Sequence, residues 1–197
     1  MKKILVWFRR DLRLADNPAL YAAKQHSVIP IYIHAPEEQA PWQPGGASHW
    51  WLHQSLDALA AELRKVGSRL ILRQGDTAAT LLQLIEETGA SGVYCNRMYE
   101  PATMQRDAAI KRMLAERGVE YKSFAAGLLF EPWTVLTKSA TPYKVFTPFW
   151  NTCQKIGLPS DVQPGIRKLS SVSTQIKSVP LTQLQLLPKI NCCPIIK

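Results

Sequence analysis

Short apolar runs alternate along the chain with longer segments in which apolar residues recur at helical spacing. The short runs lie at residues 4–8, 28–33, 69–73, 91–95 and 120–124, and their length and composition are typical of β-strands. Pro30, inside the second run, indicates either the start of that strand or a position that is locally unpaired. The alternation predicts five parallel strands joined by crossover helices.

Four helices are predicted between these strands, each with a start or stop signal in the sequence. The signals are Asn17-Pro18 before the first helix, Ser48 and Gly67 at the two ends of the second, Asp76 and Gly89 around the third, and Pro101 and Gly118 around the fourth. Because the connections are short, we expect a Rossmann-like α/β fold. Its doubly wound, five-stranded parallel sheet would have the order 3-2-1-4-5, with helices on both faces.

A sheet of this order predicts a ligand site at the carboxyl ends of its strands, between residues 9–13 and residues 96–100. The first loop reads RRDLR, and its guanidinium groups suit forked contacts with phosphate or carboxylate groups. Alternatively, Asp11 and the arginines pair with one another and fix the loop to the sheet. The spacing alone leaves both interpretations open.

The charge and composition divide the chain into three parts. Residues 1–133 form the predicted α/β domain, residues 134–158 a connecting segment with a short helix, and residues 159–197 a basic tail with linker-like composition. The net charge of +9 comes mainly from residues beyond 133. We interpret this basicity as that of a solvated linker, with a DNA contact as the alternative.

The cysteines fit neither a metal site nor a disulfide framework, and the adjacent pair Cys192-Cys193 suits neither arrangement. A reducing, cytoplasmic location fits best. We also expect no signal peptide, because the apolar part of the N-terminus is short and soon meets charge, and no membrane span, because no apolar run is long enough.

Residues 5–20, LVWFRRDLRLADNPAL, closely resemble the opening of the DNA photolyase and cryptochrome family. A second match, PYKVFTPFW at residues 142–150, resembles the family segment that follows its N-terminal α/β domain. Between them, Gly89-Ala-Ser, Tyr99-Glu-Pro and Arg106-Asp107 fall in the expected order. The stretches PGGASHWWL at residues 44–52 and LFEPW at residues 129–133 resemble the branch of plant cryptochromes and related bacterial photolyases.

The resemblance implies an antenna chromophore, either a deazaflavin or methenyltetrahydrofolate, bound by the α/β domain of a flavoprotein family. By similarity to the deazaflavin type of site, the cofactor-binding residues are Arg10, Asp11, Ile33, His34, Ala35, Ser48, Trp51, Met98 and Glu100. Where folate-binding members have an Asn-Glu pair, this chain has Ala102-Thr103, which argues against the common folate arrangement. The alternatives are folate bound in another way, a deazaflavin, or no antenna. Of the adjacent residues Trp50 and Trp51, one is expected in the core and the other in the crevice or at a domain interface.

Family members are longer than this chain, and their helical domain binds FAD and damaged DNA. We therefore expect a truncated antenna domain of a deoxyribodipyrimidine photo-lyase, a DNA-repair lyase that splits pyrimidine dimers in light. Alone it would be inactive, bind DNA weakly or not at all, and self-associate through its exposed interdomain face. No catalytic residue and no metal ligand are assigned. The alternatives are a cryptochrome-type light-signalling module and a nucleotide-binding α/β domain, although no Gly-rich phosphate loop follows the first strand.

Overall fold

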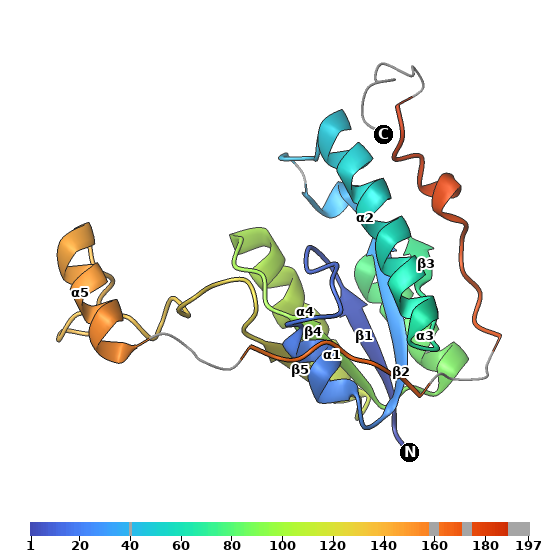
Figure 1. Ribbon diagram of the computed structural model, residues 1–197, viewed down its shortest axis with the longest axis horizontal. Helices are drawn as coiled ribbons and strands as arrows, with labels where there is room; N and C mark the ends of the chain where they lie inside the picture. The colour runs from blue at the N-terminus through green and yellow to red at the C-terminus, as the bar shows by residue number, and fades with distance from the viewer. Residues whose placement is uncertain (40, 158–161, 171–174, 189–197) are drawn as a thin grey trace.

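The computed structural model describes residues 1–39, 41–157, 162–170 and 175–188. Its five strands form one parallel sheet with the order β3-β2-β1-β4-β5, which confirms the predicted topology (Figure 1). The strands are β1 (Lys3–Phe8), β2 (Ser27–His34), β3 (Ile71–Gln74), β4 (Gly92–Asn96) and β5 (Glu120–Phe124).

Helices cover both faces of this sheet. The helices of the described residues are α1 (Pro18–Ala23), the 3-10 helix η1 (Pro36–Gln39), α2 (Gly46–Lys65), α3 (Thr77–Thr88), α4 (Pro101–Glu116), α5 (Phe146–Ile156) and the 3-10 helix η2 (Leu181–Leu184), of which α1 to α4 pack on the sheet. One core cluster joins the sheet to α1 and α2, and a second joins its opposite face to α3 and α4. The sheet is therefore buried on both sides, as its continuous apolar strands predict.

The helix ends follow the sequence signals with one exception. Asn17 and Asp76 each accept a hydrogen bond from a backbone N–H in the first turn of α1 and α3, and Gly89 ends α3 in the left-handed conformation. The prediction that Ser48 caps the longest helix is wrong, because α2 already begins at Gly46, with Gly45 as its N-cap. Ser48 therefore lies within the first turn.

Pro30 lies in the middle of β2, opposite Val6 of β1. Ser27 donates its backbone N–H to the carbonyl of Lys2, just before β1, whereas Val28 donates to Ser170 on the other side of β2. Since donors alternate along a strand, the nitrogen of Pro30 faces the side of β3, and β3 pairs with β2 only from Ile31 onward. Pro30 thus removes no ladder bond, which confirms the interpretation of a locally unpaired position.

The described parts of the tail, residues 162–170 and 175–188, run along the α1 and α2 side of the domain and past the edge of β3 (Figure 1). Four apolar side chains of the tail are at least nine-tenths buried, namely Leu169, Ile176, Leu184 and Leu186. The backbone N–H of Leu72 in β3 donates to the Ser178 hydroxyl, and the backbone N–H of Val179 donates to the Leu72 carbonyl. The tail therefore covers the free edge of β3, which its linker-like composition did not predict.

The connecting segment carries α5, which stands away from the sheet at one end of the molecule (Figure 1). The predicted boundary between this segment and the tail, at residues 158 and 159, and the Cys192-Cys193 pair both lie outside the described residues.

Candidate functional site

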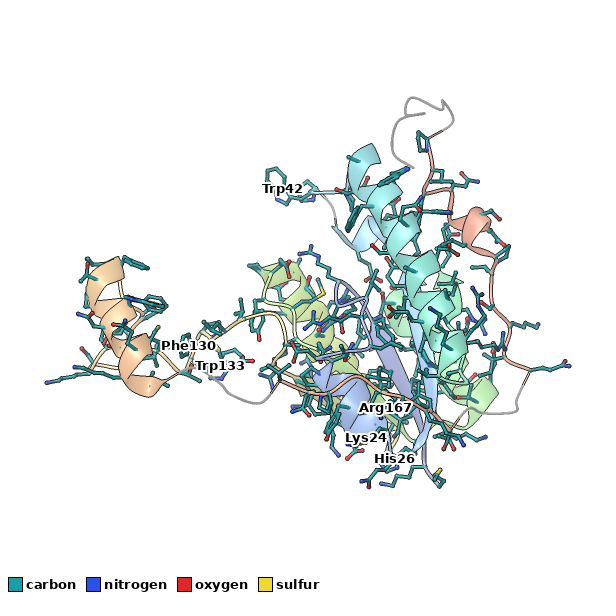
Figure 2. The ribbon with its side chains drawn as sticks, viewed as in Figure 1. Lys24, His26, Trp42, Phe130, Trp133 and Arg167 are labelled. Carbon is teal, nitrogen blue, oxygen red and sulfur yellow. The ribbon has the colours of Figure 1, made fainter. Side chains whose placement is uncertain are left out.

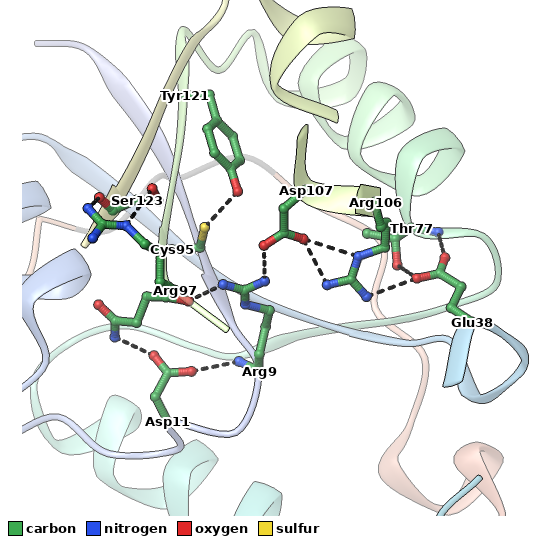
Figure 3. A network of polar contacts seen from close by, with 11 residues as sticks. Arg9, Asp11, Glu38, Thr77, Cys95, Arg97, Arg106, Asp107, Tyr121 and Ser123 are labelled. Carbon is green, nitrogen blue, oxygen red and sulfur yellow. Dashed lines mark hydrogen bonds and ion pairs between the residues drawn. The ribbon is translucent and has the colours of Figure 1, made fainter. Parts of the chain in front are cut away.

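The loops after β1 and β4 meet at the carboxyl edge of the sheet, where the strand order reverses. Arg9 follows β1 directly, and its side chain is only 5% exposed. One guanidinium nitrogen donates to Asp107 Oδ2 at 2.5 Å, and the other donates to the backbone carbonyl of Asn96 (Figure 3). The guanidinium also lies 4.7 Å from the ring centroid of the buried Trp7. Arg9 therefore fixes the β1 loop to β4 and α4.

Asp11 has a similar structural role. Its carboxylate accepts hydrogen bonds from the backbone N–H of Arg9 at 2.9 Å and from Asn96 Nδ2 at 2.5 Å (Figure 3). The same Asn96 amide donates to Asn17 Oδ1, and its oxygen accepts from the N–H of Ala19. For Arg9 and Asp11, the structure thus supports the interpretation that the charged loop is tied to the sheet.

The network continues from Arg9 along the carboxyl edge, toward η1 and the start of α3. Arg106 donates to Asp107 Oδ1 at 2.9 Å and to Glu38 Oε2 at 3.0 Å. Glu38 accepts in turn from the backbone N–H and the hydroxyl of Thr77, at the start of α3 (Figure 3). Polar and charged groups from α4, η1 and α3 are therefore joined in one connected set, which holds the loops rigidly around the carboxyl edge.

Arg10 and Arg13 differ from Arg9, because their guanidinium groups reach solvent. The Arg10 side chain is 69% exposed and pairs through Nη1 with Glu100 in the β4 loop. Arg13 is 44% exposed and contacts Asp16 through the backbone carbonyl and, at 3.4 Å, through the carboxylate. These two cations are the ones that an anionic ligand can reach.

Cys95, at the end of β4, is a buried group with little reactivity. Its Sγ atom lies 3.2 Å from the hydroxyl of Tyr121 (Figure 3). Burial raises the pKa of the Cys95 thiol, although the nearby Arg9 guanidinium opposes this effect. The thiol therefore stays protonated at neutral pH and does not act as a nucleophile.

A groove of about 910 Å³ opens beside the Arg10 loop, between the end of β2 and the first turns of α2. Arg10, Ser48 and Trp51 line it, as does Trp42 from the preceding loop. Trp42 is 88% exposed and Trp51 is 68% exposed, and Figure 2 shows Trp42 projecting from the body of the molecule. The volume lies within the range of sites for cofactor-sized ligands.

Three further cavities surround the groove at the same edge. One of about 490 Å³ is lined by Asp11, Met98 and Glu100, and one of about 380 Å³ by His34 and Ala35. The third, of about 70 Å³, is lined by Ile33, Ala35 and Met98. Arg10 lines the groove, the 490 Å³ cavity and the 70 Å³ pocket, so it lies at their common junction.

All nine predicted cofactor-binding residues thus lie at the carboxyl edge, but only Arg10, Ser48 and Trp51 share the large groove. His34 is buried, its ring 6.3 Å from that of His49 in an edge-to-face arrangement. Burial, followed by the proximity of His49, lowers the pKa of His34. Trp50, next to Trp51 in sequence, is half-buried and does not line the groove.

Sequence reasoning missed Tyr32 and Trp42, which both line the groove. Strand alternation could have drawn attention to Tyr32, because it is a polar-tipped residue at the carboxyl end of an otherwise apolar strand. Trp42 shortly precedes the Pro-Gly-Gly stretch before α2, so it lies in a predicted loop and not on the buried face of a helix. Its exposure is a property that only the structure reveals.

The described ranges hold neither a metal-binding cluster nor a helix able to span a membrane. No group of three or more His, Cys, Asp or Glu side chains there is placed to hold a metal ion. Among those same residues, no helix has the length and apolar content that crossing a membrane requires.

Comparison with known proteins relates the domain to photolyases and cryptochromes. A family model described as DNA photolyase matches residues 4–166. The deoxyribodipyrimidine photo-lyase of Agrobacterium fabrum is 44% identical over 94% of this chain and 38% of its own length. Cryptochrome-2 of Arabidopsis thaliana is 38% identical over 90% of this chain and 29% of its own length. The chain therefore spans well under half of these relatives.

Solved structures agree with the sequence relatives. A bacterial class III photolyase from Agrobacterium tumefaciens superimposes with a TM-score of 0.88 at 42% identity, covering 95% of this chain and 39% of the photolyase. An archaeal photolyase from Sulfolobus tokodaii, described as containing two FAD molecules, gives a TM-score of 0.76 at 27% identity over 98% of this chain and 43% of its own. On this combined sequence and structural agreement, the chain belongs to the DNA photolyase family and corresponds to its N-terminal α/β domain.

Proposed function

We propose that this chain is the antenna-binding domain of a deoxyribodipyrimidine photo-lyase that repairs pyrimidine dimers in DNA. The observation that carries the proposal is the groove of about 910 Å³ at the carboxyl edge of the sheet, bordered by Trp51, Trp42 and Arg10. A parallel sheet binds its ligands at this edge, and exposed indole rings beside a groove suit a flat chromophore.

The proposed ligand is a deazaflavin or methenyltetrahydrofolate, which supplies absorption of near-ultraviolet or blue light when bound. Ala102 and Thr103 lie in the first turn of α4 and line none of the four cavities, which supports a position in the groove rather than the common folate arrangement. Ser48 supplies a hydroxyl and Arg10 a cation at the rim. The indole rings of Trp42 and Trp51 would orient the chromophore by stacking.

We assign the repair chemistry itself to FAD, which a helical domain binds together with the damaged DNA in members of the family. We assign no catalytic residue in this chain. The Arg9 network contributes indirectly, because it holds the β1 and β4 loops in fixed positions around the groove. A cytoplasmic location is also proposed, supported by the free cysteines Cys95 and Cys153, both of which are buried.

The proposal is tested by adding a deazaflavin or methenyltetrahydrofolate to the purified chain and separating bound from free ligand by gel filtration. A chromophore band that elutes with the protein is expected, and the Trp51→Ala variant should lose most of it. Trp150→Ala, in the remote helix α5, serves as the control and should keep it. If wild-type protein retains neither chromophore, the proposal is contradicted.

A cryptochrome-type light-signalling module is the second candidate, supported by the 38% identity to Arabidopsis cryptochrome-2. Both functions predict chromophore binding, so binding does not separate them. Light-dependent association with a protein partner, without light-dependent repair of dimers by a longer polypeptide that contains this domain, would favour signalling.

A further inference from the structure

Tyr32 carries a buried hydroxyl group for which the domain supplies no partner. The residue lies near the carboxyl end of β2 and is 8% exposed. Across the described ranges, its hydroxyl makes no hydrogen bond. That hydroxyl is not fully enclosed by protein atoms, and the Tyr32 side chain lines both the large groove and the adjoining 70 Å³ pocket. The hydroxyl is therefore open to the groove.

Buried tyrosine hydroxyls normally find a partner, because an unpaired polar group is costly away from bulk water. Burial raises the pKa of Tyr32 to about 12, so the phenol stays protonated at neutral pH. A protonated phenol donates its hydrogen bond to an acceptor. The floor of the groove thus offers a donor that a ligand can use.

The residues on the walls and rim of the groove indicate which chemical groups such a ligand carries. Trp42 and Trp51 present large exposed indole surfaces on its wall, which suit stacking against a flat ring. At the rim, Arg10 uses Nη1 for Glu100, and across the described part of the chain its Nη2 and Nε have no partner. Such a guanidinium suits a phosphate or carboxylate group.

We propose that Tyr32 donates a hydrogen bond to an acceptor atom at the edge of the planar ring bound in the groove, and so selects ligands that carry an acceptor at that position. Trp42 covers the exposed face of the bound ring, and Arg10 binds the anionic substituent. This inference rests on the proposed function, since it adds Tyr32 as a further binding residue of the same site.

The decisive variant is Tyr32→Phe, which removes only the hydroxyl oxygen. Because that hydroxyl has no protein partner, the unliganded variant should be as stable to urea as wild type, whereas a structural hydroxyl would leave it less stable. Tyr21→Phe, on α1 and outside the groove, is the matched control.

Binding is measured by fluorescence titration with a deazaflavin, with methenyltetrahydrofolate and with flavin mononucleotide. Tyr32→Phe should weaken binding about 2- to 10-fold, the range for one lost hydrogen bond. It should also shift the absorption maximum of the bound ring, because the edge contact is lost. Tyr21→Phe should change neither.

The outcomes separate the inference from the proposed function. Equal affinity and an unchanged spectrum for wild type and Tyr32→Phe with an antenna chromophore would overturn the inference and leave the proposed function intact. If flavin mononucleotide is the one probe of the three that binds, and Tyr32→Phe weakens its binding, the result would support the inference and contradict the antenna role. Binding of none of the three probes would contradict both.

The role of Trp42 is tested by the dissociation rate of the bound probe. Trp42→Ala should release it faster than wild type, and Trp42→Phe should restore part of the difference, because a phenyl ring still stacks. Identical dissociation from Trp42→Ala and wild type would exclude the covering role.

Discussion

Adjacent arginines in the β1 loop have opposite environments. The Arg9 side chain is almost completely buried, whereas that of Arg10 is 69% exposed. The sequence RRDLR predicts a charged loop but not which guanidinium turns inward. That choice depends on Asp107 and on the Asn96 carbonyl, which the fold brings from distant parts of the chain. Long-range partners of this kind cannot be identified from local spacing.

At this scale we predict that Asp107→Asn destabilises the domain by about 3 kcal/mol, because it leaves a buried guanidinium without its carboxylate. Asp16→Asn, which removes the carboxylate partner of the exposed Arg13, should cost less than about 1 kcal/mol. Urea denaturation of both variants measures the difference. Equal unfolding midpoints for the two variants would show that the buried pair contributes no more than the surface pair.

A second prediction at the residue scale concerns pH. Burial and His49 lower the pKa of His34 in the folded state, so the unfolded chain binds a proton there at higher pH than the native one. The free energy of unfolding should therefore fall as the pH decreases below about 6.5, which is the pKa of a histidine in the unfolded chain. The fall should end where His34 also becomes protonated in the native state. His34→Gln should flatten this part of the profile of melting temperature against pH, and His26→Gln should not. An unchanged slope in His34→Gln would assign the effect to other groups.

At the scale of elements, the strands and their order could be predicted because apolar runs and short connections leave few alternatives. The tail could not be predicted in the same way. Its composition is rich in Ser, Thr, Gln and Pro, yet isolated apolar residues such as Leu169 and Leu184 pack into the core. Without periodic spacing, no sequence pattern marks such residues as buried.

The tail offers a matched pair of substitutions. Leu184 is 3% exposed and packs into the α2 side of the core, whereas Leu187, three residues later, is 45% exposed. Leu184→Ala should lower the free energy of unfolding by about 2–5 kcal/mol, and Leu187→Ala by less than about 1 kcal/mol. Chemical denaturation gives both values. Similar small losses would mean that the tail packs without contributing to stability.

At the scale of the whole molecule, large exposed apolar side chains gather on the stretch of chain that runs from Leu129 through α5. Leu129, Trp133, Val145, Phe146 and Trp150 are each at least 40% exposed. Figure 2 labels Phe130 and Trp133 on the stretch of chain between the sheet and α5. Exposed apolar patches on a small protein favour association.

We therefore predict that the isolated chain self-associates through this surface. Light scattering coupled to gel filtration should give a mass above that of one chain, increasing with concentration. Replacing Phe146 and Trp150 together by Ser should return the mass to that of a monomer. The control Val162→Ser, at a 77% exposed position in the tail, should leave association unchanged. A wild-type monomer at high concentration would contradict the prediction.

The exposure of Trp42, Trp51 and Arg10 has a consequence for how the site can change. These side chains stand largely in solvent, while the Arg9 network and the two cores maintain the fold beneath them. Replacing any of the three should therefore cost little stability. The preference of the groove for one ligand over another is thus open to alteration by single substitutions, through evolution or design, without rebuilding the domain that carries it.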